Sequence, residues 1–225
     1  MKPELHKELE GGVEAKFLNN RLGVDLSLYD RQSSDLIIDL DLDPATGFTN
    51  TTVNAAELEN KGVELGLNIT PLKGKNFSWD ITLNYTKNVS EVTKIADGVD
   101  QVQVPGGAFG GRALPWAIPG ETYGVMQSQA ILKDANGNRV VNNQGIYQTD
   151  PNQSIIGNPQ PDYTTTFITE LTYKWLSFRV QVDYQKGGDI FSSTVYTLMG
   201  RGILEETGFD RFVPVIAEGV RADGT

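Results

Sequence analysis

Apolar and polar residues alternate along several segments of this chain, each about ten residues long. In Lys61–Thr70, four apolar residues alternate with glycines and polar residues, and Phe77–Thr86 and Leu176–Gln185 repeat the pattern. Because successive side chains of a strand point to opposite faces, each segment is predicted to be a β-strand with one apolar and one polar face. Another such strand is predicted at Leu22–Leu28, after a turn at Asn19–Asn20.

The connections between these strands are either very short or very long. Pro71–Asn76 and Tyr173–Trp175 are short, whereas Asp41–Asn60, Asn88–Asp162 and the chain after Lys186 are long. A transmembrane β-barrel has tight turns at one rim and long loops at the other. The pattern therefore predicts an all-β fold: an antiparallel transmembrane β-barrel section, built as an open sheet of about six to eight strands and forming part of a larger barrel.

An antiparallel β-sandwich is the main alternative, since it produces the same alternation with its apolar residues facing a core. Sandwich loops do not usually sort into two lengths, and a connection of about seventy residues is unusual inside a compact domain. Aromatic residues near the predicted strand ends also fit the girdles of a membrane barrel. These are Phe77, Trp79, Tyr85, Tyr173, Trp175 and Tyr184.

Composition excludes several other classes of protein. With 39% hydrophobic residues and a mean hydropathy of -0.30, the chain contains no apolar run of about eighteen residues, so no membrane-spanning helix is expected. The net charge of -10 argues against nucleic acid and anionic membrane surfaces as partners. The absence of cysteine removes disulfides, zinc–cysteine sites and thiol catalysis.

The sequence contains no recognisable catalytic constellation. The one histidine, His6, stands among Glu4, Lys7 and Glu8 and is expected to be solvated. There is no nucleophile elbow, phosphate-binding glycine loop or histidine cluster with metal-ligand spacing. We therefore expect no catalytic residue, metal or cofactor, and we expect that the chain is not an enzyme.

The long middle connection has organisation of its own. Prolines and glycines break up Val104–Gly120, and Tyr123–Lys133 is predicted to add a short strand. Asn136–Gly137 predicts a hairpin turn, because both residues tolerate a positive φ. Asp134–Asn138 superficially resembles a calcium loop, but no glutamate occupies the closing position, so a plain turn is favoured. Helix is expected to be scarce, with at most one turn starting at Leu204.

Five short motifs follow one another in order along most of the chain. They are Lys2–Glu4, Asn60–Leu65, Phe77–Trp79 with Asn84–Asn88, Gly157–Tyr163 and Gly187–Ile190. This succession resembles the late barrel of SusC/RagA-type TonB-linked outer-membrane proteins. The resemblance implies a barrel of about 22 strands in the bacterial outer membrane, with this chain as a C-terminal section. It also implies import of oligosaccharides, or of peptides, together with a surface lipoprotein of the SusD kind.

Residues 1–225 are expected to be a partial TonB-dependent receptor barrel domain, because the family's signal peptide, plug, TonB-contacting segment and last strands are not recognised in the sequence. The expected partners are outer-membrane lipid, a SusD-like lipoprotein, a glycan or peptide ligand, and the TonB complex through the N-terminal part that is absent here. No nucleic acid is expected. A soluble β-sandwich binding module and a passive porin or adhesin barrel are the alternatives.

Two sets of residues are candidate functional positions. The polar residues of the predicted strands would face the lumen and hold the plug and water by hydrogen bonds and ion pairs. The ionisable members of this set are Asp25, Glu64, Asp80, Glu170, Arg179 and Asp183. Glycans stack on aromatic faces, so aromatic residues of the middle connection are candidates for substrate contact, with packing inside the loop as their alternative role. These are Phe109, Trp116, Tyr123 and Tyr147.

Overall fold

The computed structural model describes residues 1–41, 43–104, 113–213 and 218–221, which divide by their contacts into two compact units. The first unit consists of Met1–Gln103, Trp116–Gly124 and Asn158–Asp189. The second consists of Val104–Pro115, Val125–Gly157 and Ile190–Thr225. Phe109, one of the predicted substrate-contact residues, lies outside the described residues.

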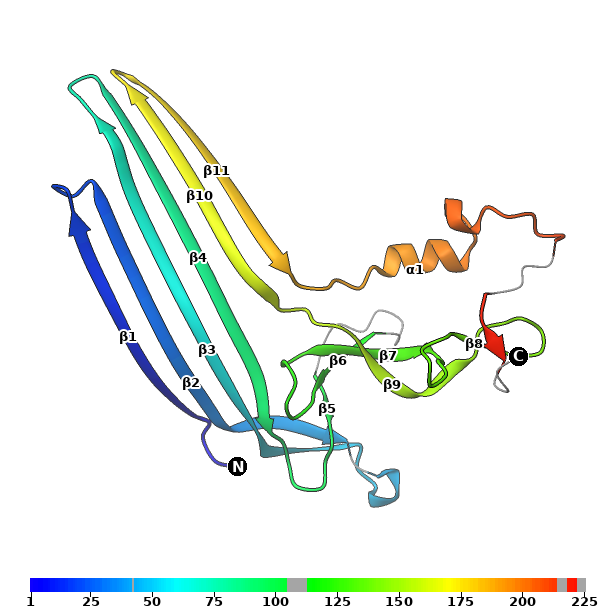
Figure 1. The fold of residues 1–225 in the computed structure, drawn as a ribbon. Helices are drawn as coiled ribbons and strands as arrows, with labels where there is room; N and C mark the ends of the chain where they lie inside the picture. Colours follow the sequence, from blue (N-terminus) through cyan, green and yellow to red (C-terminus); the bar gives the residue numbers. More distant parts are fainter. Residues whose placement is uncertain (42, 105–112, 214–217, 222–225) are drawn as a thin grey trace. The chain divides into compact units, whose positions relative to one another are not determined.

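A six-stranded antiparallel sheet in the order β1-β2-β3-β4-β10-β11 forms most of the first unit, and we call it the wall sheet (Figure 1). Its strands are β1 (Leu5–Phe17), β2 (Leu22–Asp41), β3 (Asn50–Lys73), β4 (Phe77–Lys94), β10 (Pro161–Tyr173) and β11 (Leu176–Gly187). Successive strands of the wall sheet pair with one another, and no described residue pairs with the outer edge of β1 or β11. The predicted open antiparallel sheet is confirmed.

Tight turns join β1 to β2, β3 to β4 and β10 to β11. In the first turn, Leu18, Asn19 and Asn20 have φ angles of 54°, 56° and 62°, which confirms the turn predicted at the two asparagines. The last turn contains Lys174 with a φ of 54°. Few residues other than glycine and asparagine adopt this left-handed conformation, so Leu18 and Lys174 carry local backbone strain.

The strands of the wall sheet are longer than their alternating segments. The long connection expected at Asp41–Asn60 is wrong, because β3 begins at Asn50 and leaves residues 42–49 between β2 and β3, including the 3-10 turn η1 (Pro44–Thr46). The connection expected from Asn88 is also wrong at its start, since β4 continues to Lys94. A backbone ladder satisfies its N–H and C=O groups whatever the side chains are, so it continues after the alternation has faded.

A bulge at Asp35 interrupts the pairing of β2 with β3, and the register shifts between Ser33 and Leu36. Asp35 has a φ of 55°, and the side chain of Asn54 on β3 forms a hydrogen bond with its backbone. Asn54 Nδ2 donates a hydrogen bond of 2.7 Å to the Asp35 carbonyl, while Asn54 Oδ1 accepts one of 2.6 Å from the Lys2 backbone N–H. An asparagine side chain thus replaces ladder bonds that the bulge removes.

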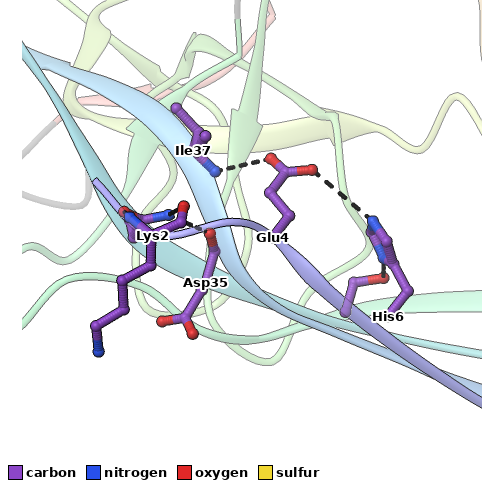
Figure 2. Close-up of polar contacts among 7 residues, drawn as sticks. Lys2, Glu4, His6, Asp35 and Ile37 are labelled. Atoms are coloured by element: carbon purple, nitrogen blue, oxygen red, sulfur yellow. Dashed lines mark hydrogen bonds and ion pairs between the residues drawn. The ribbon is translucent and has the colours of Figure 1, made fainter.

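Glu4, just before β1, and His6, at the start of β1, contact β2 on either side of the bulge through their side chains. Glu4 Oε1 accepts the backbone N–H of Ile37 at 2.9 Å, and Glu4 Oε2 lies 3.8 Å from His6 Nε2 (Figure 2). His6 Nδ1 is 2.8 Å from Ser33 Oγ. His6 is therefore exposed, as expected of a solvated residue, but also helps to attach the N-terminal segment to β2.

Within the described part of the chain, the apolar residues of the alternating segments are not packed beneath a second sheet. Leu65, Leu67, Ile81 and Val180 are all only partly buried. Among the residues whose burial is described, few apolar residues of the first unit are buried, and these belong to the ends of the strands far from the tight turns or to the segment that follows them. They are Ala56, Val92, Ile95, Val102 and Ala117. The β-sandwich alternative, which requires a buried core between sheets, is wrong for this unit.

Part of the middle connection packs on the end of β4. The backbone N–H of Val92 donates to the Glu121 carbonyl at 2.9 Å, and the N–H of Gly120 donates to the Val92 carbonyl at 2.8 Å. The short strand β5 (Val102–Gln103) pairs with the Trp116–Ala117 end of β6 (Leu114–Ala117). These bonds place Trp116 and the residues after it in the first unit.

The second unit contains short strands and two short helices. They are β7 (Val125–Ile131), β8 (Val140–Val141), β9 (Thr149–Gly157), β12 (Val220–Arg221), α1 (Ser193–Gly200) and the 3-10 turn η2 (Glu205–Thr207). Strand β7 pairs with β9 and agrees with the short strand predicted within Tyr123–Lys133. The turn η2 begins one residue after Leu204, whereas α1 was not predicted. None of the helices in the described residues is long and apolar enough to cross a membrane.

Candidate functional site

The register of the wall sheet separates two faces. Residues paired directly across strands lie on one face, so each row of partners can be followed through the whole sheet. One such row is apolar: Ala15, Val24, Leu67, Leu83, Phe167 and Val182. The adjacent row, one position along each strand, is polar or glycine: Glu14, Asp25, Gly66, Asn84, Thr166 and Asp183. We call the two sides the apolar face and the polar face.

All six ionisable residues predicted from the alternation lie on the polar face. Asp25 and Asp183 occupy the polar row just described. Asp80, Glu170 and Arg179 form another row, in which Glu170 is the partner of both other residues. Glu64 is paired with Ser27 and with Thr86, farther from the tight turns. The structure thus brings the predicted set onto one surface, although at different heights along the strands.

Side chains of the polar face bind one another across strands. Thr166 Oγ1 donates to Asp183 Oδ1 at 2.7 Å, and Thr70 Oγ1 donates to Asp80 Oδ1 at 2.6 Å. The Arg179 guanidinium lies 3.7 Å from the Glu170 carboxylate, and both side chains remain partly exposed. Because hydroxyl donors and an opposite charge satisfy these carboxylates only in part, the face retains acceptors for water and for polar ligands.

A polar hollow of about 450 Å3 lies on the polar face at the end far from the tight turns. It is lined by Glu8, Glu10, Tyr29, Arg31, Ser33, Asn60, Glu64 and Asn88. The Tyr29 hydroxyl donates to Asn88 Oδ1 at 3.0 Å, and Arg31 Nε lies 3.9 Å from a carboxylate oxygen of Glu8. The hollow therefore offers both carboxylate acceptors and a guanidinium donor to a polar ligand.

Sequence reasoning found only Glu64 among the ionisable residues of this hollow. The signal for the others was present, because Glu8 and Glu10 alternate with Leu9, and Tyr29 and Arg31 continue the alternation of Leu22–Leu28. The predicted strand ends at Leu28, because the next residue on the apolar side of the alternation is Asp30. The structure continues it to Asp41, since β1 and β3 both pair with this part of β2.

The aromatic candidates divide between the two units. Trp116 belongs to the first unit, and its indole Nε1–H is buried with no hydrogen-bond partner among the described residues. Tyr123 is also in the first unit and is 37% exposed, and the next residue, Gly124, donates its N–H to the Trp116 carbonyl at 3.0 Å. Tyr147 is in the second unit, where its hydroxyl accepts Arg139 Nη1 at 3.3 Å and its ring lies 5.6 Å from that guanidinium.

The turn at Asp134–Asn138 closes on its own donors. The Asp134 carboxylate accepts the backbone N–H groups of Asn136 at 2.9 Å and Asn138 at 2.8 Å, together with the Asn138 side-chain amide at 3.0 Å. These hydrogen bonds, the Asn138 amide first, hold the pKa of the Asp134 carboxyl below its usual range. Gly137 has a φ of 86°, whereas Asn136 does not have the positive φ that the predicted hairpin turn allowed for both residues. This geometry agrees with a plain turn, and within the described residues no cluster of His, Asp or Glu could hold a metal ion.

A family model and a curated relative each match most of this chain. A family model described as TonB dependent receptor-like, beta-barrel, matches residues 1–184. TonB-dependent receptor P26 of Formosa agariphila is 30% identical over 209 residues, which cover 84% of this chain and 21% of that protein. TonB-dependent receptor SusC of Bacteroides thetaiotaomicron is 36% identical over 90 residues, covering 40% of this chain and 9% of that protein.

Solved structures show the same fold. The RagAB peptide transporter matches with a TM-score of 0.62 and 22% sequence identity, over 82% of this chain and 21% of that chain. Together these matches confirm the resemblance to SusC/RagA-type proteins and the antiparallel barrel-section fold. The chain spans about a fifth of the length of two curated Formosa agariphila relatives, 21% of receptor P26 and 23% of receptor P3.

Proposed function

Because the chain belongs to the TonB-dependent receptor β-barrel family, we propose that it forms part of the wall of an outer-membrane nutrient importer of the SusC/RagA type. Barrels of this family are outer-membrane proteins that act in transport, so the chain is an outer-membrane section and not an enzyme. In the proposal, the apolar face contacts outer-membrane lipid and the polar face lines the lumen. The single observation that carries it is the separation of the apolar row from Ala15 to Val182 and the adjacent polar row from Glu14 to Asp183, both of which cross all six strands.

The polar face has the chemistry of a water-filled lumen. A tightly closed core would have to bury carboxylates such as Asp80 and Asp183, which is costly unless each is fully paired. In the proposed barrel these groups bind water and a plug supplied by the whole protein. Their bonds to Thr70 and Thr166 fix the carboxylates in place while leaving acceptor positions open.

Oligosaccharide is the proposed cargo, delivered by a SusD-like surface lipoprotein at the long-loop rim. Trp116 supports a sugar ligand, because its aromatic ring is only partly buried and an aromatic face can stack on a sugar. Tyr123 lies close to it in the chain and is exposed. Phe109 and Tyr147 are further proposed contacts. Peptide is the second candidate, favoured by the fold similarity to the RagAB peptide transporter.

Uptake in the host bacterium tests this function. Deleting the gene that encodes the whole protein should abolish growth on one class of a panel of purified oligosaccharides and defined peptides, and complementation should restore it. Collapsing the proton gradient should stop uptake, because a TonB-linked importer needs energy. Uptake that persists without the gradient would instead identify a passive porin, and recovery of the protein from the soluble fraction without detergent would contradict the membrane assignment.

The proposed sugar contact can be tested within the same assay. Trp116→Ala should raise the oligosaccharide concentration for half-maximal uptake by roughly tenfold, since loss of one ring–ligand contact costs about 1–2 kcal/mol. Trp175→Ala is the matched control, because Trp175 is in the tight turn between β10 and β11 and is 89% exposed. If both substitutions change the concentration for half-maximal uptake equally, Trp116 does not contact the sugar.

A further inference from the structure

Three tyrosines stand side by side on the apolar face, at the end far from the tight turns. The ring centroids of Tyr85 and Tyr163 are 5.4 Å apart, and those of Tyr163 and Tyr184 are 6.1 Å apart. The register places Tyr85 beside Leu65, which confirms that the row belongs to the apolar face. Aromatic rows at this position are typical of the border between the hydrocarbon core and the headgroups.

Two lysines lie at the height of Tyr163 on the two neighbouring strands, one step beyond Tyr85 and Tyr184. Lys87 follows Tyr85 by two residues on β4, and Lys186 follows Tyr184 by two residues on β11. Lys186 is the direct partner of Tyr163, with Nζ 5.9 Å from the ring centroid. Both lysines are exposed on the same face as the tyrosines.

Neither lysine is neutralised within the described part of the chain, because no ion pair there includes Lys87 or Lys186. Lys16 and Lys61 differ, since each lies 2.8 Å from a glutamate oxygen. The net charge of -10 makes general attraction to anionic surfaces unfavourable. Although the chain is acidic as a whole, these two lysines place positive charge at one border of the apolar face.

An apolar hollow of about 650 Å3 adjoins Lys87 on this face. Its walls include Leu9, Leu28, Val63 and Val89, of which Leu9 is 79% exposed. A second hollow of about 510 Å3 is lined by Lys87, Tyr163 and Lys186, and one acidic residue, Asp162, also lines it. Lys87 therefore joins a groove suited to a hydrocarbon chain to a cationic position suited to a headgroup.

The height of the lysines along the strands matches the thickness of a membrane. Lys87 lies about ten residues beyond Phe77, and Lys186 lies about ten residues beyond Leu176, at a strand rise of about 3.3 Å per residue. With a tilt of about 40°, this gives about 25 Å, the height of the apolar band of an outer-membrane barrel. Because long loops are extracellular, the lysines lie at the outer-leaflet border of that band.

We propose that Lys87 and Lys186 bind the phosphate of a phosphorylated outer-leaflet glycolipid, with Tyr163 between them and one acyl chain in the hollow beside Lys87. Two ammonium groups complement a phosphate, and the exposed leucines and valines of the hollow gain an apolar neighbour. The inference rests on the proposed function, because this face must contact the outer leaflet. It adds a specific lipid site to a wall that would otherwise contact lipid only through its apolar surface.

Lipid binding to the complete membrane protein that contains this chain tests the site. The probes are a bisphosphorylated lipid A and the same lipid after removal of its phosphates, counted on the protein by native mass spectrometry. The double substitution Lys87→Gln and Lys186→Gln should weaken retention of the phosphorylated lipid by roughly tenfold or more. It should not change retention of the dephosphorylated lipid. Lys73→Gln with Lys75→Gln, next to the tight turn between β3 and β4, is the matched control. Equal retention of both lipids, or an unchanged double variant, overturns the proposal.

A second measurement separates failure of this site from failure of the membrane assignment. The chain contains no cysteine, so a fluorophore can be attached at Leu67→Cys on the apolar face and at Asn68→Cys on the polar face. Brominated acyl chains should quench only the first. If Leu67 is quenched but the lysines show no phosphate selectivity, the lipid site alone is wrong. If Leu67 is not quenched, both the lipid site and the assignment of the faces are wrong.

Discussion

Tyr29 covers Gly62 of the neighbouring strand on the polar face, and the Tyr29 hydroxyl donates a hydrogen bond of 3.0 Å to Oδ1 of Asn88. A Cβ at position 62 would collide with the tyrosine ring, so only glycine permits this close approach. One aromatic side chain thereby links β2, β3 and β4 at the polar hollow. The same ring shields a backbone position in β3 that has no side chain of its own.

Gly62→Ala should displace the Tyr29 ring and break its bond to Asn88, with a loss of about 1–3 kcal/mol in the free energy of unfolding. Gly66→Ala is the control, because a Cβ there would meet its nearest atom, Asp25 Cβ, at an ordinary 3.6 Å. Reversible unfolding in detergent or lipid measures both. Equal losses in the free energy of unfolding for the two variants would show that Tyr29 does not require a glycine at position 62.

Arginine substitutions on the two sides of β3 and β4 should distinguish the apolar face from the polar face. Leu67→Arg or Leu83→Arg should cost roughly 2–4 kcal/mol of folding stability near the bilayer midplane, because each places a charge in lipid. Asn68→Arg should cost much less, since residue 68 faces the proposed lumen. Unfolding from lipid vesicles measures the difference, and similar tolerance at positions 67 and 68 would contradict the assignment of the faces.

Protease cleavage sites inserted into the protein should report the orientation of the wall sheet when intact cells are treated with protease. A site placed near Asn136, in the long middle connection, should be cleaved from outside, because long loops of such barrels are extracellular. A site at Lys73–Gly74, in the tight turn after β3, should be protected until the outer membrane is opened. Cleavage of the second site alone in intact cells would show the opposite orientation.

The turn after Asp134 should lose its structure only at acid pH. Because the pKa of the Asp134 carboxyl is lowered in the folded turn, its stabilisation is complete above the ordinary Asp pKa and is lost as the pH falls through the lowered value. Amide exchange at Asn136 and Asn138 should follow this titration. Asp134→Ala should abolish the protection at every pH, whereas Asp100→Ala should leave it unchanged. Protection that persists in Asp134→Ala would show that the carboxylate does not hold the turn.

Alternation in the sequence identified the strands where one face is apolar, because the period of two is a local property of each strand. The alternation places Asp80, Arg179 and Asp183 on the polar side of their strands. Their positions in the paired rows agree with this assignment. The alternation could not find the outer half of β3, from Asn50 to Asn60, since neither face is consistently apolar there. It also missed α1, which is only eight residues long and begins with the Ser192 side chain accepting the Val195 N–H.

The sequence by itself therefore determined the strand type, the tight turns and the chemistry of each face, all of which depend on residues close together in the chain. The tertiary structure alone decided which residues meet across strands. The fit of Tyr29 over Gly62 depends on a register across two strands, and the hold of Asn54 on the Asp35 bulge depends on an irregular pairing. The reason is physical: register and bulges are properties of paired backbones, and no single strand contains its partner.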